Sequence, residues 1–261
     1  MKGIVTAIRT LSSLPIPGRE VRRFSDALVW FPAVGFLLGG IVYLTAVLLS
    51  STFWMDWPEG VAIVCIGLSV LITGGLHLDG VADWADGFWG GNSPQRVLTI
   101  MKDTHLGAFG AIALVLVLLS KWVAVVKMME LHRLEWIVAA YIVSRAMQVE
   151  LAVCLPYARR EGTAFPYLAN ANGLHRLTAH ILALGVLAIL YNFTGLLCFF
   201  LAAILIWGFG KWCLKRAGGV TGDLLGAGSE LVEVFVLFFS VSVPSELLRY
   251  HLFFAGFLQS S

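Results

Sequence analysis

The chain has 261 residues, of which 59% are hydrophobic and only 13% are charged. Soluble globular domains carry about 25% charged residues, so the composition argues against a soluble domain and predicts a polytopic membrane protein. The formal net charge of +2 is too small to indicate a nucleic-acid partner. The four cysteines are scattered without a metal-binding spacing.

Residues 1–28 are predicted to form a short amphipathic helix followed by a loop. Four apolar residues recur at helical spacing before Pro15 and Pro17 end the pattern. We expect this segment to lie at the cytoplasmic surface of the bilayer.

The whole chain, 1–261, is predicted to be one all-α transmembrane domain with about seven spans and a range of six to eight. Spans are expected at about 29–50, 60–76, 107–126, 136–155 and 231–243, with a weaker candidate at 247–258. The run 177–212 is too long for one span. Its break at Tyr191-Asn192-Phe193-Thr194 predicts two tightly linked helices. A short helix is expected to begin at Ser93-Pro94.

The distribution of basic residues predicts the orientation. If the spans alternate, the N-terminus and segments 77–106, 156–176 and 211–230 share one side. That side holds thirteen Lys and Arg, and the other holds at most Lys121, Lys127 and Arg133. Because short basic loops stay cytoplasmic, we expect these segments to form one cytoplasmic-side cavity.

The most informative stretch is 74–87, in which Asp79, Asp83 and Asp86 follow an apolar run. In a helix this spacing places the three carboxylates on one face, where like charges repel. A bound Mg²⁺ that also holds a substrate phosphate would relieve the repulsion. The alternative from spacing alone is an ion pathway or a set of snorkelling charges in a transporter.

Further candidates lie near the same predicted side. Asp103 beside Lys102 is expected to act as a ligand or base, or to be a charged surface turn. His77 is expected to be a polar interface histidine or to take part in proton transfer or substrate binding. Arg145, within an apolar span, needs an acidic partner or a substrate phosphate.

The turn Gly218–Asp223 is a weak phosphate-binding signal because it lacks the Walker spacing. Its default interpretation is an interhelical turn in which Asp223 caps the next helix. Because this turn is predicted to face the cytoplasmic-side cavity, Thr221 and Asp223 are candidate substrate contacts.

The stretch 74–87 and the segment Met101–Gly110 together resemble the cobalamin synthase family of adenosylcobinamide-GDP ribazoletransferases. Pro156-Tyr157-Ala158-Arg159, with Gly162-Thr163-Ala164, and Gly219–Asp223 are similar to further family segments. The resemblance covers most of the chain.

The resemblance implies an inner-membrane enzyme of late vitamin B12 assembly, which completes the nucleotide loop and requires Mg²⁺. The 3′-hydroxyl of α-ribazole, or of its 5′-phosphate, would attack the phosphoryl group on cobinamide, and GMP would leave. Its substrates would be small molecules. The other expected partners are membrane lipid and a second copy or other cobalamin-assembly enzymes, with no nucleic acid.

Phosphoryl transfer requires mainly positioning and charge neutralisation, which leads to a predicted division of roles. The predicted metal ligands are Asp79, Asp83, Asp86 and Asp103; the catalytic candidates are Asp86, Asp103 and His77; the substrate-binding candidates are Lys102, Arg145, Arg159, Thr221 and Asp223. The acidic stretch also resembles the motif of CDP-alcohol phosphotransferases, but Ala82 stands where those enzymes have Arg.

Two alternatives remain from the sequence. A phospholipid-forming CDP-alcohol phosphotransferase would release CMP instead of GMP. A cation- or proton-coupled transporter would move its substrate without converting it, although transporters often contain internal repeats and none is evident here.

Overall fold

The structure is a computed structural model that describes residues 2–52, 56–159, 161–244 and 247. Within these residues it is all-helical, as the sequence predicts, apart from one isolated β-bridge between Tyr157 and Val220. The predicted span at 247–258 lies outside the described residues except for Leu247.

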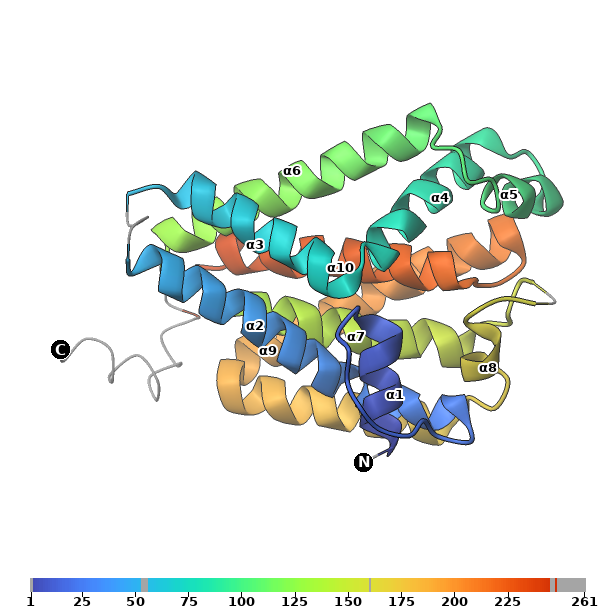
Figure 1. Cartoon of the computed structure of the whole chain (residues 1–261), viewed down its shortest axis with the longest axis horizontal. Coiled ribbons are helices and arrows are strands. Elements are labelled where there is room, and N and C mark those ends of the chain that lie inside the picture. The colour runs from blue at the N-terminus through green and yellow to red at the C-terminus, as the bar shows by residue number, and fades with distance from the viewer. Residues whose placement is uncertain (1, 53–55, 160, 245–246, 248–261) are drawn as a thin grey trace.

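The long helices lie side by side in one bundle (Figure 1). The elements are α1 (Lys2–Leu11), the 3-10 helix η1 (Phe24–Trp30), α2 (Phe31–Ser50), α3 (Pro58–Thr73), α4 (Leu76–Gly90), α5 (Pro94–Ile100), α6 (Ala108–Glu130), α7 (Trp136–Cys154), α8 (Phe165–Leu168), α9 (Gly173–Ala217) and α10 (Gly222–Ser242). Helix α7 is the most buried, with 83% of its apolar window inside the protein, and it contacts α2, α9 and α10.

In the part of the chain that the structure describes, five helices are long and apolar enough to cross a membrane, and α3 with α4 forms a sixth candidate bent by 90°. The bend arises at Gly74 and Gly75, which both adopt left-handed φ angles, 64° and 69°, that favour glycine. The acidic stretch is therefore a separate helix at an angle to the apolar run before it.

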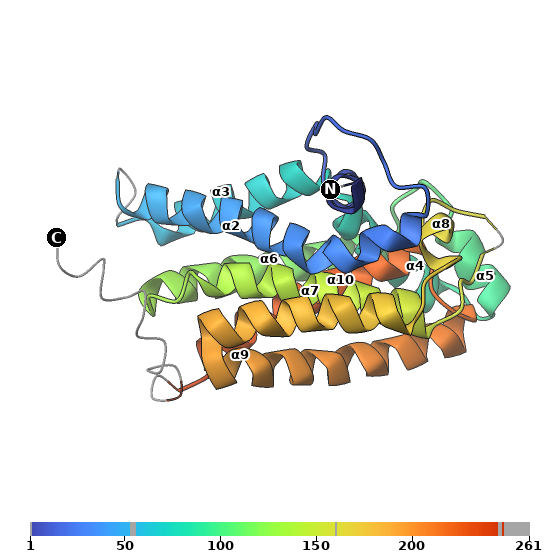
Figure 2. The same cartoon turned by 90° about the horizontal axis from the view of Figure 1, so that it is seen from below.

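Helix α9 contains the predicted break. Its backbone is non-helical at Asn192, where φ is 49°. Tyr191 donates a hydrogen bond to the Glu135 carbonyl, at the start of α7, whereas Arg176 and Gly210 both lie at the end of α7. The chain thus reverses at Asn192, as Figure 2 shows. Counting the two arms separately adds one candidate to the five helices and the bent pair in the described residues. The predicted span at 60–76 differs, because α3 has only 16 residues and reaches spanning length only together with the acidic helix α4.

One end of the bundle gathers the sequence segments of interest. Helix α5, the end of α4, both ends of α9, the start of α10 and α8 lie there, whereas α1 lies nearer the middle of the bundle (Figures 1 and 2). We call it the α5 end. Ser13, just after α1, donates its backbone N–H to the Ile72 carbonyl, 2.8 Å away, so the N-terminal segment packs on the bundle beside the α3–α4 bend.

Candidate active site

Helix α4 carries the three predicted carboxylates. Its other face is buried, and Trp84 there contacts Phe209 and Trp212 of α9 edge to face, with ring centroids 5.7 and 5.6 Å apart. Asp79 is exposed, and Asp83 and Asp86 are half-buried. The predicted acidic helical face is therefore present, and packing of the opposite face holds it in place.

The expectation of an interface position for His77 is wrong, because this side chain is only 2% exposed. It faces α10 at Gly226, where an added Cβ would lie 3.1 Å from the His77 Cα. The absence of a side chain on Gly226 lets the two helices meet. Direct proton transfer by His77 stays a prediction.

Asp86 joins the first family segment to the second. Its two carboxylate oxygens accept hydrogen bonds from the backbone N–H groups of Gly107 and Gly110, at 2.8 and 2.9 Å. These N–H groups belong to the first turn of α6, which would otherwise lack acceptors and which favours a negative charge. Asp86 thus acts as a tertiary cap of α6, a role that the sequence analysis missed.

Arg159 connects the third family segment, in which it lies, to the fourth, Gly219–Asp223. Its guanidinium lies 2.9 Å from the Asp223 carboxylate and donates to the Met101 carbonyl at 3.3 Å. A short β-bridge brings the segments together: Ala158 donates its N–H to Val220, and Val220 donates to Pro156, at 2.8 and 2.9 Å.

The start of α10 differs from its prediction in one respect. Thr221, not Asp223, is the N-cap, because its hydroxyl accepts the Leu224 N–H at 3.3 Å. The hydroxyl is also 3.2 Å from the Asp223 carboxylate. Asp223 is left to face Arg159 and α4.

Helices α4 and α10 meet closely at Gly80, where an added Cβ would overlap the Asp223 carbonyl oxygen. This approach brings Asp223 near the acidic face. Asp83 experiences the charges of Asp223, Asp79 and Asp86, together with the opposing charge of Arg159. The structure thus adds Asp223 to the group of carboxylates around Asp83.

The donor chemistry of this group fits a hard divalent cation. Mg²⁺ takes carboxylate oxygens and commonly binds through one or two of them, with water and substrate phosphate completing the shell. Within the described residues no three acidic, His or Cys side chains are close enough to surround an ion by themselves. Protein carboxylates and a substrate phosphate would therefore have to share the ion.

Asp103 is not brought into this group. It lies on the surface, and its Oδ1 accepts the His105 N–H at 3.1 Å and lies 2.7 Å from the His105 ring nitrogen. These hydrogen bonds, led by the ring contact, hold the pKa of Asp103 below its ordinary value. Lys102, beside it, is also exposed.

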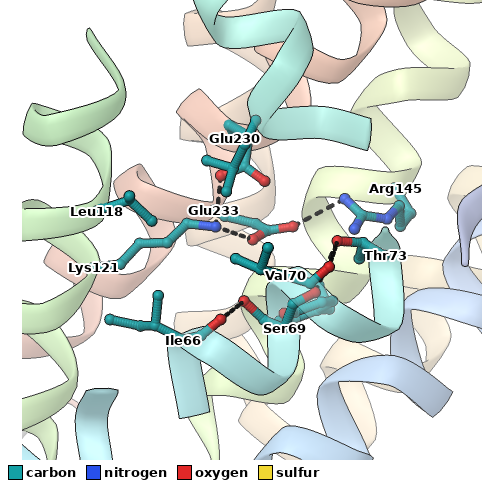
Figure 3. A pocket seen from close by; sticks show the side chains of 11 residues that line it. Ile66, Ser69, Val70, Thr73, Leu118, Lys121, Arg145, Glu230 and Glu233 are labelled. Carbon is teal, nitrogen blue, oxygen red and sulfur yellow. Dashed lines mark hydrogen bonds and ion pairs between the residues drawn. The ribbon is translucent and has the colours of Figure 1, made fainter. Parts of the chain in front are cut away.

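Arg145 has an acidic partner inside the bundle, as one of its two predicted interpretations required. Its side chain is fully buried and lies 2.9 Å from Glu233 of α10. Lys121 is also buried, 2.6 Å from Glu230 and 2.7 Å from Glu233. Figure 3 shows this network beside a small cavity of about 10 Å³.

The network corrects the predicted topology in detail. Lys121, which was counted toward the opposite side, lies within α6 and points into the bundle. Arg133 is also buried and donates to the carbonyls of Ser240 and Val243. Glu230 and Glu233 were not predicted as partners, although acidic residues within an apolar run were a signal that a buried cation faced them.

Arg216 is a further residue that the sequence analysis did not single out. It donates to the carbonyls of Phe88 and Gly91, the latter at 2.7 Å. These acceptors lie at the end of α4, where carbonyl groups lack helical partners and favour a positive charge. Arg216 thus connects the end of α9 to the acidic helix.

The arrangement therefore provides clustered carboxylates, one guanidinium already engaged with a carboxylate, and backbone connections among four family segments. Such a site can hold a cation-bound anionic substrate and neutralise charge on a leaving phosphate.

Comparison with known proteins gives a consistent result. A family model described as cobalamin-5-phosphate synthase matches residues 3–241. The chain is 44% identical over 253 residues to the adenosylcobinamide-GDP ribazoletransferase of Chlorobium chlorochromatii (strain CaD3), covering 95% of this chain and 99% of the relative.

Other relatives carry the same name. The protein of Chlorobaculum tepidum is 41% identical over 240 residues, covering 90% of this chain and 93% of the relative. That of Klebsiella pneumoniae is 35% identical over 245 residues, covering 91% and 98%. No solved structure matches the chain.

Proposed function

This chain belongs to the cobalamin-5-phosphate synthase family, and from that membership we propose that it is an adenosylcobinamide-GDP ribazoletransferase. It joins adenosylcobinamide-GDP to α-ribazole, or to α-ribazole 5′-phosphate, in a late step of cobalamin biosynthesis. The observation that supports this most directly is the meeting of four family segments through the contacts of Asp86, Gly80, Arg159 and Val220.

In the proposed reaction the 3′-hydroxyl oxygen of α-ribazole forms a bond to the phosphorus attached to cobinamide. The bond from that phosphorus to the bridging pyrophosphate oxygen breaks, GMP carries the electron pair away, and the hydroxyl proton is lost. The reaction requires no oxidant or other co-reactant. The protein supplies positioning and charge neutralisation.

We assign Asp79 and Asp83 to hold Mg²⁺ because they offer the least engaged carboxylates of the acidic face. When bound, the ion would neutralise pyrophosphate charge. We assign Arg159 to bind the departing phosphate. Asp223, whose carboxylate is 3.2 Å from the Thr221 hydroxyl, would orient the Arg159 guanidinium. Lys102 and Asp103, at the surface of the α5 end, are assigned to the approach of the substrate; whether Asp103 also serves as ligand or base stays a prediction.

The several apolar helices of spanning length indicate a membrane protein. We further propose that it lies in the cytoplasmic membrane with the α5 end facing the cytoplasm. The support is charge: Lys121 points into the bundle, which leaves only Lys127 and Arg133 of the three basic residues that the sequence assigned to the opposite side.

The test uses purified protein in detergent with Mg²⁺ and defined substrates. Adenosylcobinamide-GDP with α-ribazole should give GMP and adenosylcobalamin in equal amounts by mass spectrometry. CMP release from a CDP-alcohol and a lipid acceptor would instead favour the phospholipid alternative. Corrinoid flux into liposomes without conversion would favour a transporter.

A further inference from the structure

The buried network of Lys121, Arg145, Glu230 and Glu233 lies apart from the acidic face and is not required by the reaction itself. It connects three helices at one level: Lys121 lies on α6, Arg145 on α7, and both glutamates on α10. Each of the four side chains is at most 8% exposed. Two cations face two carboxylates, so the group is electrically balanced.

Two hydroxyl groups extend the network. Arg145 also donates to Ser229 of α10, and Ser144 of α7 donates to Glu233 at 3.4 Å. Glu233 thus receives Lys121 on one oxygen and Arg145 on the other, at 2.7 and 2.9 Å. The Glu233 carboxylate therefore fixes the separation of α6 and α7, which carry the two cations.

A need for stability does not account for the network. Desolvating charges is costly, and well-packed apolar residues often stabilise a protein as well as a buried ion pair does. Charges in an apolar bundle are retained where they fix a geometry or a function.

The geometry that these ion pairs fix is the rotation of α10 about its axis. At 100° per residue, Glu230 projects about 20° from the direction of Asp223, two turns along the same helix. Asp223 lies against Gly80 of the acidic helix and within the field of Asp83. Holding Glu230 and Glu233 therefore sets the rotation of α10, and that rotation sets where Asp223 and Thr221 point.

We propose that the Lys121–Glu230–Glu233–Arg145 network is a positioning device that holds α10 in the rotation required for Asp223 to complete the phosphate-binding site. The four residues are positioning residues that do not touch substrate. This inference rests on the proposed function, because its readouts include that reaction.

The test removes one ion of each sign. Lys121→Gln with Glu230→Gln leaves the Arg145–Glu233 pair intact and the charge balanced. The matched control is Lys127→Gln with Glu130→Gln, an exposed pair at the opposite end with the same 2.7 Å separation. Measurements are kcat, KM, thermal unfolding and binding of Mn²⁺ by electron paramagnetic resonance.

The network variant is expected to lower kcat on the order of 10²-fold, the effect of roughly 1 Å of misplacement, and to weaken Mn²⁺ binding. The single variant Lys121→Arg keeps a cation that can pair with both glutamates, so its kcat and its Mn²⁺ affinity should match those of wild type. The control should match wild type. Wild-type kcat and Mn²⁺ affinity in a folded network variant would overturn the inference.

If the double variant does not fold, Glu233→Asp keeps every charge and shortens the acceptor by one methylene. The expected result is a lower kcat with little change in KM, and an unchanged kcat would overturn the proposal. Failure of the proposed function is distinguishable, since wild type would then release no GMP while Mn²⁺ binding could still be compared among the variants.

Discussion

Arg159 and Asp223 form an ion pair of 2.9 Å that joins the loop after α7 to the first turn of α10. The same guanidinium donates to the Met101 carbonyl, so Arg159 contacts two segments of the α5 end besides its own. A planar guanidinium can keep these contacts while presenting another N–H edge to a phosphate, which a lysine ammonium cannot do.

Arg159→Gln is therefore expected to lower kcat/KM on the order of 10²-fold, comparable to the loss of one donor to a developing charge. Arg159→Lys should recover little of the activity because it loses the bidentate geometry. The comparison is steady-state GMP release, with Arg96→Gln as an exposed control. Equal activity of Arg159→Gln and wild type would exclude Arg159 from the site.

Gly80→Ala should damage both folding and activity. The added Cβ overlaps the Asp223 carbonyl oxygen, so α4 and α10 must separate. Overpacking of this kind costs about 1–3 kcal/mol, and the separation moves Asp223 from Asp83. Thermal unfolding and GMP release measure the two effects.

Gly67→Ala on α3 is the matched control, since its Cβ would meet no atom within 4 Å. Alanine is the better helix former by roughly 1 kcal/mol, so this variant should unfold at the same or a higher temperature. A stable and fully active Gly80→Ala protein would show that the close contact of α4 with α10 is not needed.

Asp86→Asn separates a capping role from metal binding. Because an amide has only one oxygen, the substituted side chain can accept from only one of the two α6 N–H groups, and a stability loss of about 1 kcal/mol is expected. The Mg²⁺ concentration that gives half-maximal activity should change little. A large shift in that concentration with unchanged thermal stability would place Asp86 among the metal ligands instead.

Arg216→Gln tests the connection from α9 to the end of α4. Loss of charged hydrogen bonds to the carbonyls of Phe88 and Gly91 should cost about 2 kcal/mol of folding stability. Lys215→Gln, its exposed neighbour, should have no effect. Equal unfolding temperatures of the two variants would argue against this connection.

Local sequence patterns predicted much of the fold. The runs around α2, α3, α6 and α7 were predicted within a few residues, since length and hydropathy determine where a helix can span. The break at Asn192 and the cap at Ser93 were also predicted, because both depend on neighbouring residues. The resemblance led to the family that the comparisons then showed.

Tertiary partners could not be predicted in the same way. Nothing near Lys121 in the sequence indicates that Glu230 and Glu233 surround it. Asp86 was assigned to a metal because its spacing from Asp83 is visible, whereas its hydrogen bonds to α6 exist only after folding. His77 was placed at the interface because the close contact allowed by Gly226 involves a distant helix.

The central claim is that the acidic face of α4 is a Mg²⁺-dependent phosphoryl-transfer site. The most direct measurement is GMP release as a function of Mg²⁺ concentration for wild type, Asp83→Asn and Asp56→Asn, the last an exposed aspartate away from the site. Wild type and Asp56→Asn should show the same Mg²⁺ dependence, and Asp83→Asn should lose nearly all turnover. Wild-type turnover by Asp83→Asn at every Mg²⁺ concentration would contradict the claim.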